Sequence, residues 1–276
     1  MKKIIIIPLV TVLTVAMLAS CKKYTRLLQN VPVDRAAYLK VVHVAPGFTK
    51  VFNAPDNFNV VIGAVNGTRM AAAMTYNSVF PSNTLNTNTY AAVPSGSQDI
   101  RLVLKGVVNI DSNTVVTIPK NLNPGWYYTL IITDSITTTA DFSKIWITDN
   151  FVPPASGNYS VRFIHAAMND TAGKKVDLYS TKQAATIFSN VAPGDVSGFI
   201  TFPITTTGST GDTVIIRRAG TSFELDRYPR NATGQPSAIS YTNNQRVYTI
   251  LYKGDATFLS TTLLPKGRSI YVWNNR

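Results

Sequence analysis

The chain beyond residue 36 alternates between apolar and polar residues over short segments. Across residues 100–105, Ile, Leu and Leu alternate with Arg, Val and Lys. A two-residue period predicts a β-strand, because successive side chains of a strand point to opposite faces. Turn residues such as Pro94-Ser95-Gly96 and Pro124-Gly125 separate the segments. The pattern predicts an all-β protein built from antiparallel β-sandwiches, with an immunoglobulin-like or a transthyretin-like topology.

A hairpin is predicted in the second half of the chain. Residues 214–218 and 221–227 both have strand-forming sequences, and Ala219-Gly220 lies between them. A two-residue connection containing glycine is typical of a tight hairpin turn. Composition agrees with this class, since charged residues make up 14% of the chain and Glu224 is the single glutamate. Long amphipathic helices need more glutamate and lysine than this.

One pattern occurs twice. A basic residue, two apolar residues and a histidine appear as Lys40-Val-Val-His43 and again as Arg162-Phe-Ile-His165, 122 residues later. Aromatic strands at 127–131 and 247–251 follow at nearly the same offset. A repeat of this length is a domain, so we expect two tandem β-sandwiches at 37–150 and 158–276. The Pro- and Gly-containing segment 151–157 is the expected linker.

The second copy carries a resemblance to a known family. Its Val161–Ala167 strand is followed by Val-Asp-Leu-Tyr at 176–179 and by the Pro- and Gly-containing segment 191–203. This order resembles the bacterial extracytoplasmic family called domain of unknown function 4397 (DUF4397). The first copy, which has no Asp in residues 58–63, resembles it less closely. The resemblance implies a cell-envelope β domain and brings no known catalytic residue.

The first 21 residues predict export and a lipid anchor. Lys2 and Lys3 precede an apolar run of 15 residues, Ile4 to Leu18. A membrane-spanning helix needs about 20 residues, so the run favours a signal peptide over residues 1–20. Leu-Ala-Ser-Cys at 18–21 resembles a bacterial lipobox, in which acyl chains such as palmitate are attached to the cysteine, here Cys21. No other cysteine could pair with it.

The residues after Cys21 form the expected tether, 21–36. Lys22 and Lys23 follow the anchor, and no acidic residue occurs before Asp34. By resemblance to Gram-negative lipoproteins, this segment has neither an inner-membrane retention signal nor the acidic run of some surface-export signals. We therefore expect a lipoprotein of the outer membrane, on either its periplasmic face or the cell surface.

The charge narrows the expected partners. The formal charge is +12, of which Lys2 and Lys3 lie in the signal peptide. The remaining basic residues form only pairs, whereas nucleic-acid binders concentrate charge in one stripe. We therefore expect no nucleic-acid partner. A positive surface suits anionic lipids or acidic glycans, or it is simply solvated.

The two histidines, His43 and His165, are expected to be structural. Each shares a strand face with apolar residues, where a ring nitrogen can hold a nearby loop. A metal site needs several ligands, and neither copy has a cysteine or a second histidine. A Gly-x-Ser-x-Gly elbow is also missing from the sequence. The sequence therefore predicts no metal, no cofactor and no catalytic residue.

Acidic residues give weaker alternatives. Glu224 and Asp226 could form a glycan-hydrolase pair, but salt pairing with Arg217 or Arg218 on the facing strand explains them more simply. The loop at Asn169-Asp170 has too few acids for a calcium site. Three triplets, at 134–136, 170–172 and 212–214, are similar to an O-glycosylation signal of some envelope bacteria.

Aromatic residues offer the best functional prediction. Trp126, Trp146 and Trp273 lie near strand ends, where exposed rings can stack on sugars or anchor a protein interface. Core packing is the competing explanation.

The leading hypothesis is a non-enzymatic, membrane-anchored envelope protein that binds a glycan, a polymer or a protein. The alternatives are an assembly partner in the periplasm and, more distantly, a glycan hydrolase.

Overall fold

The structure is a computed structural model. It describes residues 35–46, 57–63, 68–81, 89–104, 114–133, 144–149, 151–168, 175–204, 211–229, 239–241, 245–255 and 266–275. The predicted signal peptide, Cys21 and most of the tether lie outside the described residues. Residues 33–276 form one compact unit, and the division into two domains stays a prediction.

Seventeen strands make up the described fold. In the first half they are β1 (Ala36–His43), β2 (Asn57–Ile62), β3 (Thr68–Thr75), β4 (Ser78–Phe80), β5 (Ala91–Pro94), β6 (Gly96–Leu104), β7 (Thr114–Leu122), β8 (Tyr127–Ile132) and β9 (Lys144–Thr148). In the second half they are β10 (Asn158–His165), β11 (Val176–Ser180), β12 (Ala185–Val191), β13 (Ile200–Pro203), β14 (Val214–Arg218), β15 (Glu224–Tyr228), β16 (Val247–Lys253) and β17 (Ser269–Asn274).

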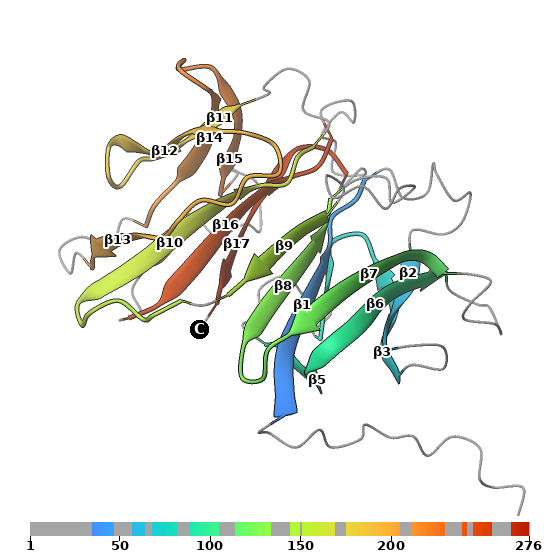
Figure 1. The fold of residues 1–276 in the computed structure, drawn as a ribbon. Coiled ribbons are helices and arrows are strands. Elements are labelled where there is room, and N and C mark those ends of the chain that lie inside the picture. Colours follow the sequence, from blue (N-terminus) through green and yellow to red (C-terminus); the bar gives the residue numbers. More distant parts are fainter. Residues whose placement is uncertain are drawn as a thin grey trace, which may run out of the picture. The chain divides into compact units, whose positions relative to one another are not determined.

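The strands form two sheets in each half (Figure 1). The first half has the orders β4-β1-β8-β9, with β5 also paired to β1, and β3-β2-β6-β7. The second half has β13-β10-β16-β17 and β12-β11-β14-β15. The all-β sandwich class predicted from alternation is confirmed. The prediction of antiparallel sheets is wrong for one pair in each half, because β1 pairs in parallel with β8, and β10 with β16. Alternation shows which residues share a strand face, but it carries no information on the direction of the neighbouring strand.

The two halves also share their register. Lys40 lies opposite Thr129 in the first half, and Arg162 lies opposite Thr249 in the second. Residues 122 positions apart in β1 and β10 therefore occupy equivalent places.

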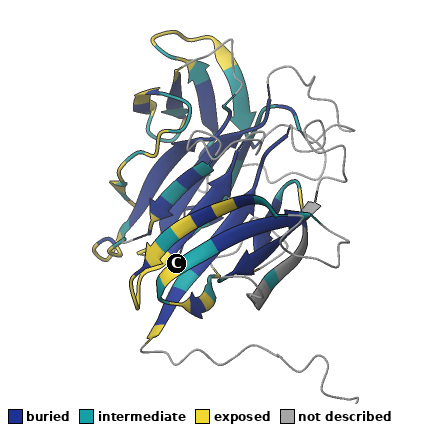
Figure 2. Ribbon diagram, turned by 45° about the vertical axis from the view of Figure 1, so that its right-hand side comes forward, coloured by how far each residue is buried: buried dark blue, intermediate teal, exposed yellow. Residues whose placement is uncertain are grey.

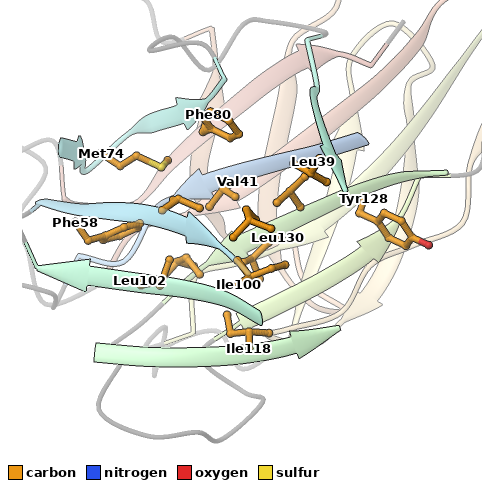
Figure 3. Close-up of a cluster of buried hydrophobic side chains, with 14 of the residues drawn as sticks. Leu39, Val41, Phe58, Met74, Phe80, Ile100, Leu102, Ile118, Tyr128 and Leu130 are labelled. Atoms are coloured by element: carbon orange, nitrogen blue, oxygen red, sulfur yellow. The ribbon is translucent and has the colours of Figure 1, made fainter. Parts of the chain in front are cut away.

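Each half has its own apolar core between its two sheets. Figure 3 shows the core of the first half, with Leu39, Val41, Phe58, Ile100, Leu102 and Leu130 among its residues. In the second half, Val161, Phe163, Leu178, Ile216 and Ile250 are central. These residues come from alternate positions of their strands, as the two-residue period predicts.

A third apolar cluster joins the two halves. It contains Val42, Val44 and Ile131 from the first half, together with the equivalent residues Ile164, Ala166 and Leu251 from the second. The sheet containing β1 and β8 is therefore covered on both faces, and so is the sheet containing β10 and β16. Strands β1, β10 and β16 are buried along nearly their whole length (Figure 2). We call this contact the junction.

The predicted hairpin is present as β14 and β15, but residues 219–223 connect its strands, so the predicted two-residue turn and the strand start at residue 221 are wrong. Gly220 in its turn has a φ of +71°, which glycine adopts without steric cost. Strand β14 pairs antiparallel with β15, and the register shifts between Ile216 and Arg217. Within the described part of the chain, no helix is long and apolar enough to cross a membrane.

Candidate functional site: a buried polar junction and two exposed apolar surfaces

Both histidines lie inside the protein. His43 and His165 have no exposed surface. The His43 ring packs 4.7 Å from the Phe58 ring, and its Nδ1 accepts a 3.4 Å hydrogen bond from the backbone of Ala45. The His165 ring lies 5.2 Å from that of Tyr252. A structural role remains the prediction for both, and their burial removes them from any solvent-facing reaction site.

The junction holds a buried ion pair. Asp149, just after β9, lies 2.5 Å from Nη2 of Arg162 on β10, and both side chains are almost fully buried. The same carboxylate accepts a 2.9 Å hydrogen bond from the hydroxyl of Tyr90 and another from the hydroxyl of Thr129. An arginine of one half is thus held by a carboxylate of the other.

The second half supplies a neutral counterpart to Asp149. Asn275 follows β17 as Asp149 follows β9, and each donates its backbone N–H to an equivalent strand at 2.7 Å. The Asn275 amide donates to the Thr249 hydroxyl at 2.6 Å and accepts from the Trp273 indole at 2.8 Å. Thr249 also accepts from Nε of Arg162 at 2.8 Å. An amide therefore stands where symmetry would place a second carboxylate.

Lys40 is the cation equivalent to Arg162. Its Nζ lies 4.3 Å from the Tyr90 ring centroid and 5.8 Å from that of Trp273. Lys40 is 1% exposed and Arg162 is 2% exposed, although both occupy the strand face opposite the histidines. Burial lowers the pKa of Lys40 to about 8, with Asp149 opposing that effect and Arg162 adding to it. Lys253 on β16 is buried as well, and its Nζ lies 5.0 Å from the centroid of the Tyr76 ring of the first half. The junction thus encloses Lys40, Arg162 and Lys253 together with the Asp149 carboxylate.

The three tryptophans have different environments. Trp126 is 42% exposed. Trp146 is partly buried against the core of the first half and stacks on Tyr128 with centroids 5.2 Å apart. Trp273 is 3% exposed and belongs to the junction cluster. Of the three predicted contact aromatics, Trp273 is therefore inaccessible to a ligand, and Trp126 is the most accessible.

Trp126 belongs to a group that we call the aromatic rim, which consists of the exposed Trp126 and Tyr127 and the half-buried Tyr38. The rings of Tyr38 and Tyr127 stack with centroids 4.6 Å apart. Tyr90 meets Tyr127 edge-on at 5.1 Å, which links the rim to the Asp149 network. Trp126 and Tyr127 are both large exposed hydrophobic residues. The rim is therefore an amphipathic surface in which the Tyr127 ring is held by contacts with the rings of Tyr38 and Tyr90.

A second exposed surface lies on the connector and beside β13. We call it the apolar edge: Phe151, Val152, Val196, Phe199 and Ile200. Val152 is 86% exposed, and Val196 and Ile200 are exposed as well. The rings of Phe151 and Phe199 are 6.2 Å apart, and the Arg162 guanidinium lies 5.1 Å from the Phe199 ring. Strand β13 is an edge strand, so the exposed side chain of Ile200 lies at a sheet edge.

The carboxylate pair on β15 has a local partner. Glu224 binds Arg227 through two contacts of 2.5 Å, and this hydrogen bonding lowers the pKa of Glu224. Arg217 lies opposite Glu224, as predicted, but its guanidinium sits 3.8 Å from the Tyr179 ring centroid. A glycosidase acid needs a raised pKa, so Glu224 has the wrong electrostatics for that role.

Asp170 and the triplets at 134–136 and 170–172 lie outside the described residues. In the third triplet, Asp212 is buried and accepts hydrogen bonds from the Ser180 hydroxyl at 2.6 Å and the Lys182 backbone at 3.0 Å. These contacts indicate that Asp212 stabilises the turn after β11. No group of three or more potential metal ligands occurs among the residues that the structure describes.

Comparison with known families supports the resemblance drawn from the sequence. Residues 37–172 match the model of the family described as "Domain of unknown function (DUF4397)". The matched range covers the first half and extends through β10, so the match lies mainly on the copy in which the resemblance was expected to be weaker. No curated protein matches the chain.

One matching solved structure is described as a "putative adhesin from Bacteroides ovatus". It is 8% identical, covers 89% of this chain and 94% of its own, and has a TM-score of 0.22. A likeness at this level carries no argument about the function of the chain.

Proposed function

We propose that the chain is a non-enzymatic lipoprotein of the outer membrane, anchored through Cys21, which binds an envelope partner through its β-sandwich body. We propose further that this body consists of two tandem copies. The shared strand order, the matching parallel pairs and the equivalent Lys40 and Arg162 positions support the duplication.

The observation that carries the non-enzymatic role is the use of polar side chains inside the protein. The histidines are buried, Asp149 and Arg162 neutralise each other in the junction, and Glu224 is paired with Arg227. The histidines and the Asp149–Arg162 pair are buried away from solvent, whereas Glu224 is exposed but has its carboxylate occupied by Arg227. Binding through exposed apolar side chains fits this distribution better than catalysis does.

The apolar edge favours a protein partner over a glycan. Sugar binding relies on accessible aromatic faces; Trp126 offers one, whereas Trp273 is buried and Trp146 is stacked on Tyr128. Val152, Val196 and Ile200 instead present aliphatic surface beside an edge strand. Exposed apolar patches of this kind mark protein contacts, and an edge strand can accept an additional strand from a partner.

Site-specific photo-crosslinking in intact cells would test the partner. A photoreactive amino acid replaces Val152 or, as a control, Thr117, which is exposed on β7. The proposal expects one discrete adduct from position 152, lost when Ile200→Asp is added, and none from position 117. The same adduct from both positions, or none from 152, would reject the apolar edge as the binding surface.

The anchor needs a separate test. Cys21→Ala should release the protein from the membrane fraction or block processing of residues 1–20. Protease treatment of intact cells, followed by detection of the second half, distinguishes surface exposure from a periplasmic assembly role. A processed Cys21→Ala protein that stays in the membrane would refute the lipoprotein assignment.

A further inference from the structure

We propose that the aromatic rim rests in the head-group layer of the membrane that holds the lipid anchor. The inference depends on the proposed anchoring through Cys21 and adds a second, non-covalent contact between the protein and the bilayer. The aromatic rim is thus proposed to contact lipid, whereas the apolar edge is proposed to contact the protein partner.

The side chains of the rim suit this environment. Trp126 and Tyr127 are exposed, and Asn123, Pro124 and Gly125 in the same turn are exposed too. The turn is therefore uncovered over five consecutive residues. Tryptophan and tyrosine collect at membrane interfaces because their rings prefer the apolar side while the indole N–H and phenol O–H reach water and head groups.

Backbone contacts place the rim where the tether enters the fold. The Gly125 N–H donates to the carbonyl of Ala36 at 2.7 Å, and the Tyr38 N–H donates to the carbonyl of Trp126 at 2.9 Å. Ala36 is the first residue of β1. The turn carrying Trp126 is thus bound directly to the strand that follows the tether.

The tether limits how far this end can lie from the bilayer. Fourteen residue steps separate Cys21 from Arg35. Even fully extended they would span no more than about 50 Å, because each residue contributes roughly 3.6 Å at most. Contact of the rim with the head groups lies well within that reach. The rim is therefore the exposed aromatic surface joined most directly to the anchor.

Charge around the tether favours a lipid surface over an uncharged polymer. Residues 22–35 contain Lys22, Lys23, Arg26 and Arg35 against Asp34, a net charge of +3. Arg35 is exposed, and its carbonyl accepts from the Ser95 N–H at 3.1 Å at the same end of the sheet. Basic residues beside an anionic membrane surface gain about 1 kcal/mol each. Aromatic rings and adjacent basic charge together match anionic phospholipid.

Fluorescence quenching can test this contact in the lipidated full-length protein. The protein is reconstituted into vesicles of phosphatidylethanolamine and phosphatidylglycerol, with or without lipids brominated on the acyl chains. Bromine quenches only indoles that reach the bilayer. Trp126→Phe removes the proposed membrane indole, and Trp126→Phe with Phe223→Trp moves an exposed indole to the β14–β15 turn. Phe223 is 57% exposed and is the matched control position.

The expected result is quenching of the wild-type protein and at least a threefold smaller effect in both variants. Equal emission with and without bromine would overturn the proposal. Quenching of the double variant that carries Phe223→Trp as strong as that of the wild type would also overturn it, since contact would then not be specific to the rim. Intact mass measures acylation of Cys21 separately, so a failed anchor is distinguishable from an anchored protein whose rim stays in water.

Discussion

Lys40 should destabilise the folded protein at neutral pH, so Lys40→Met is expected to stabilise it. The pKa of Lys40 falls from 10.5 to about 8, mainly because the side chain is buried. At about 1.4 kcal/mol for each tenfold change, the charged form costs on the order of 3 kcal/mol more in the fold than in water. Methionine has a similar length, has no charge, and leaves Asp149 and Arg162 as a balanced pair.

Part of this gain will be offset. Lys40 interacts with the rings of Tyr90 and Trp273, and such contacts contribute about 0.5–2 kcal/mol. The net expectation is therefore a stabilisation of about 1–2 kcal/mol at pH 7. Replacing buried charges with apolar residues of similar size often has this sign.

The stabilisation by Lys40→Met should depend on pH. Below pH 8 the lysine is charged in both the folded and the unfolded chain, so the full cost is present. Between pH 8 and 10.5 the unfolded chain still binds the proton while the folded chain releases it, so wild-type stability rises with pH. The advantage of Lys40→Met should shrink across this window. Burial raises the pKa of Tyr159 to about 12, which lowers stability above pH 10 in both proteins and cancels in the difference.

Urea unfolding of the mature chain, followed by tryptophan fluorescence at pH 7 and pH 9.5, measures these free energies. Lys120→Met serves as the control, since Lys120 is half-exposed over the Trp146 ring and its removal should change stability by less than about 0.5 kcal/mol. A destabilised Lys40→Met protein at pH 7, or a difference that stays constant up to pH 9.5, would refute the reasoning.

Three further predictions concern the junction and the core. His165→Ala should cost about 2–4 kcal/mol because it opens a cavity in the core, and an unchanged melting temperature would contradict a structural role. Arg162→Ala should cost about 3–5 kcal/mol because it leaves Asp149 buried without its cation; adding Asp149→Asn should cost less than the sum of the single changes in a double-mutant cycle. Trp273→Ala should cost about 3–5 kcal/mol, whereas Trp126→Ala should change stability by less than about 0.5 kcal/mol, and similar losses in urea unfolding would contradict their assigned environments.

The features that could be predicted from the sequence are those set by residues close together in the chain. The two-residue period identified the sandwich class, and Ala219-Gly220 located the β14–β15 hairpin, because strand alternation and turn geometry are local properties. The same alternation put His43 and His165 on the apolar face of their strands, where the structure buries them.

The junction could not be predicted in this way. A basic residue on a strand is usually solvated, so Lys40 and Arg162 gave no sign of burial. A signal was nevertheless present, since Val41-Val42 and Leu130–Ile132 place apolar residues on both strand faces, as in sheets covered on both sides. The pairing of Asp149 with Arg162 depends on how two sheets meet, and the burial of Trp273 follows from the same contact.

Equivalent faces of the two halves meet at the junction, which is the arrangement of a homodimer interface contained within one chain. If a protease cut the connector, the freed first half could pair with a second copy of itself, because each Lys40 would then meet an Asp149 carboxylate of its partner copy. Two second halves would bring each Arg162 against a neutral Asn275 amide in the place that Asp149 occupies in the intact chain. Cleavage should therefore leave one fragment able to self-associate and another that needs the first as its counter-charge.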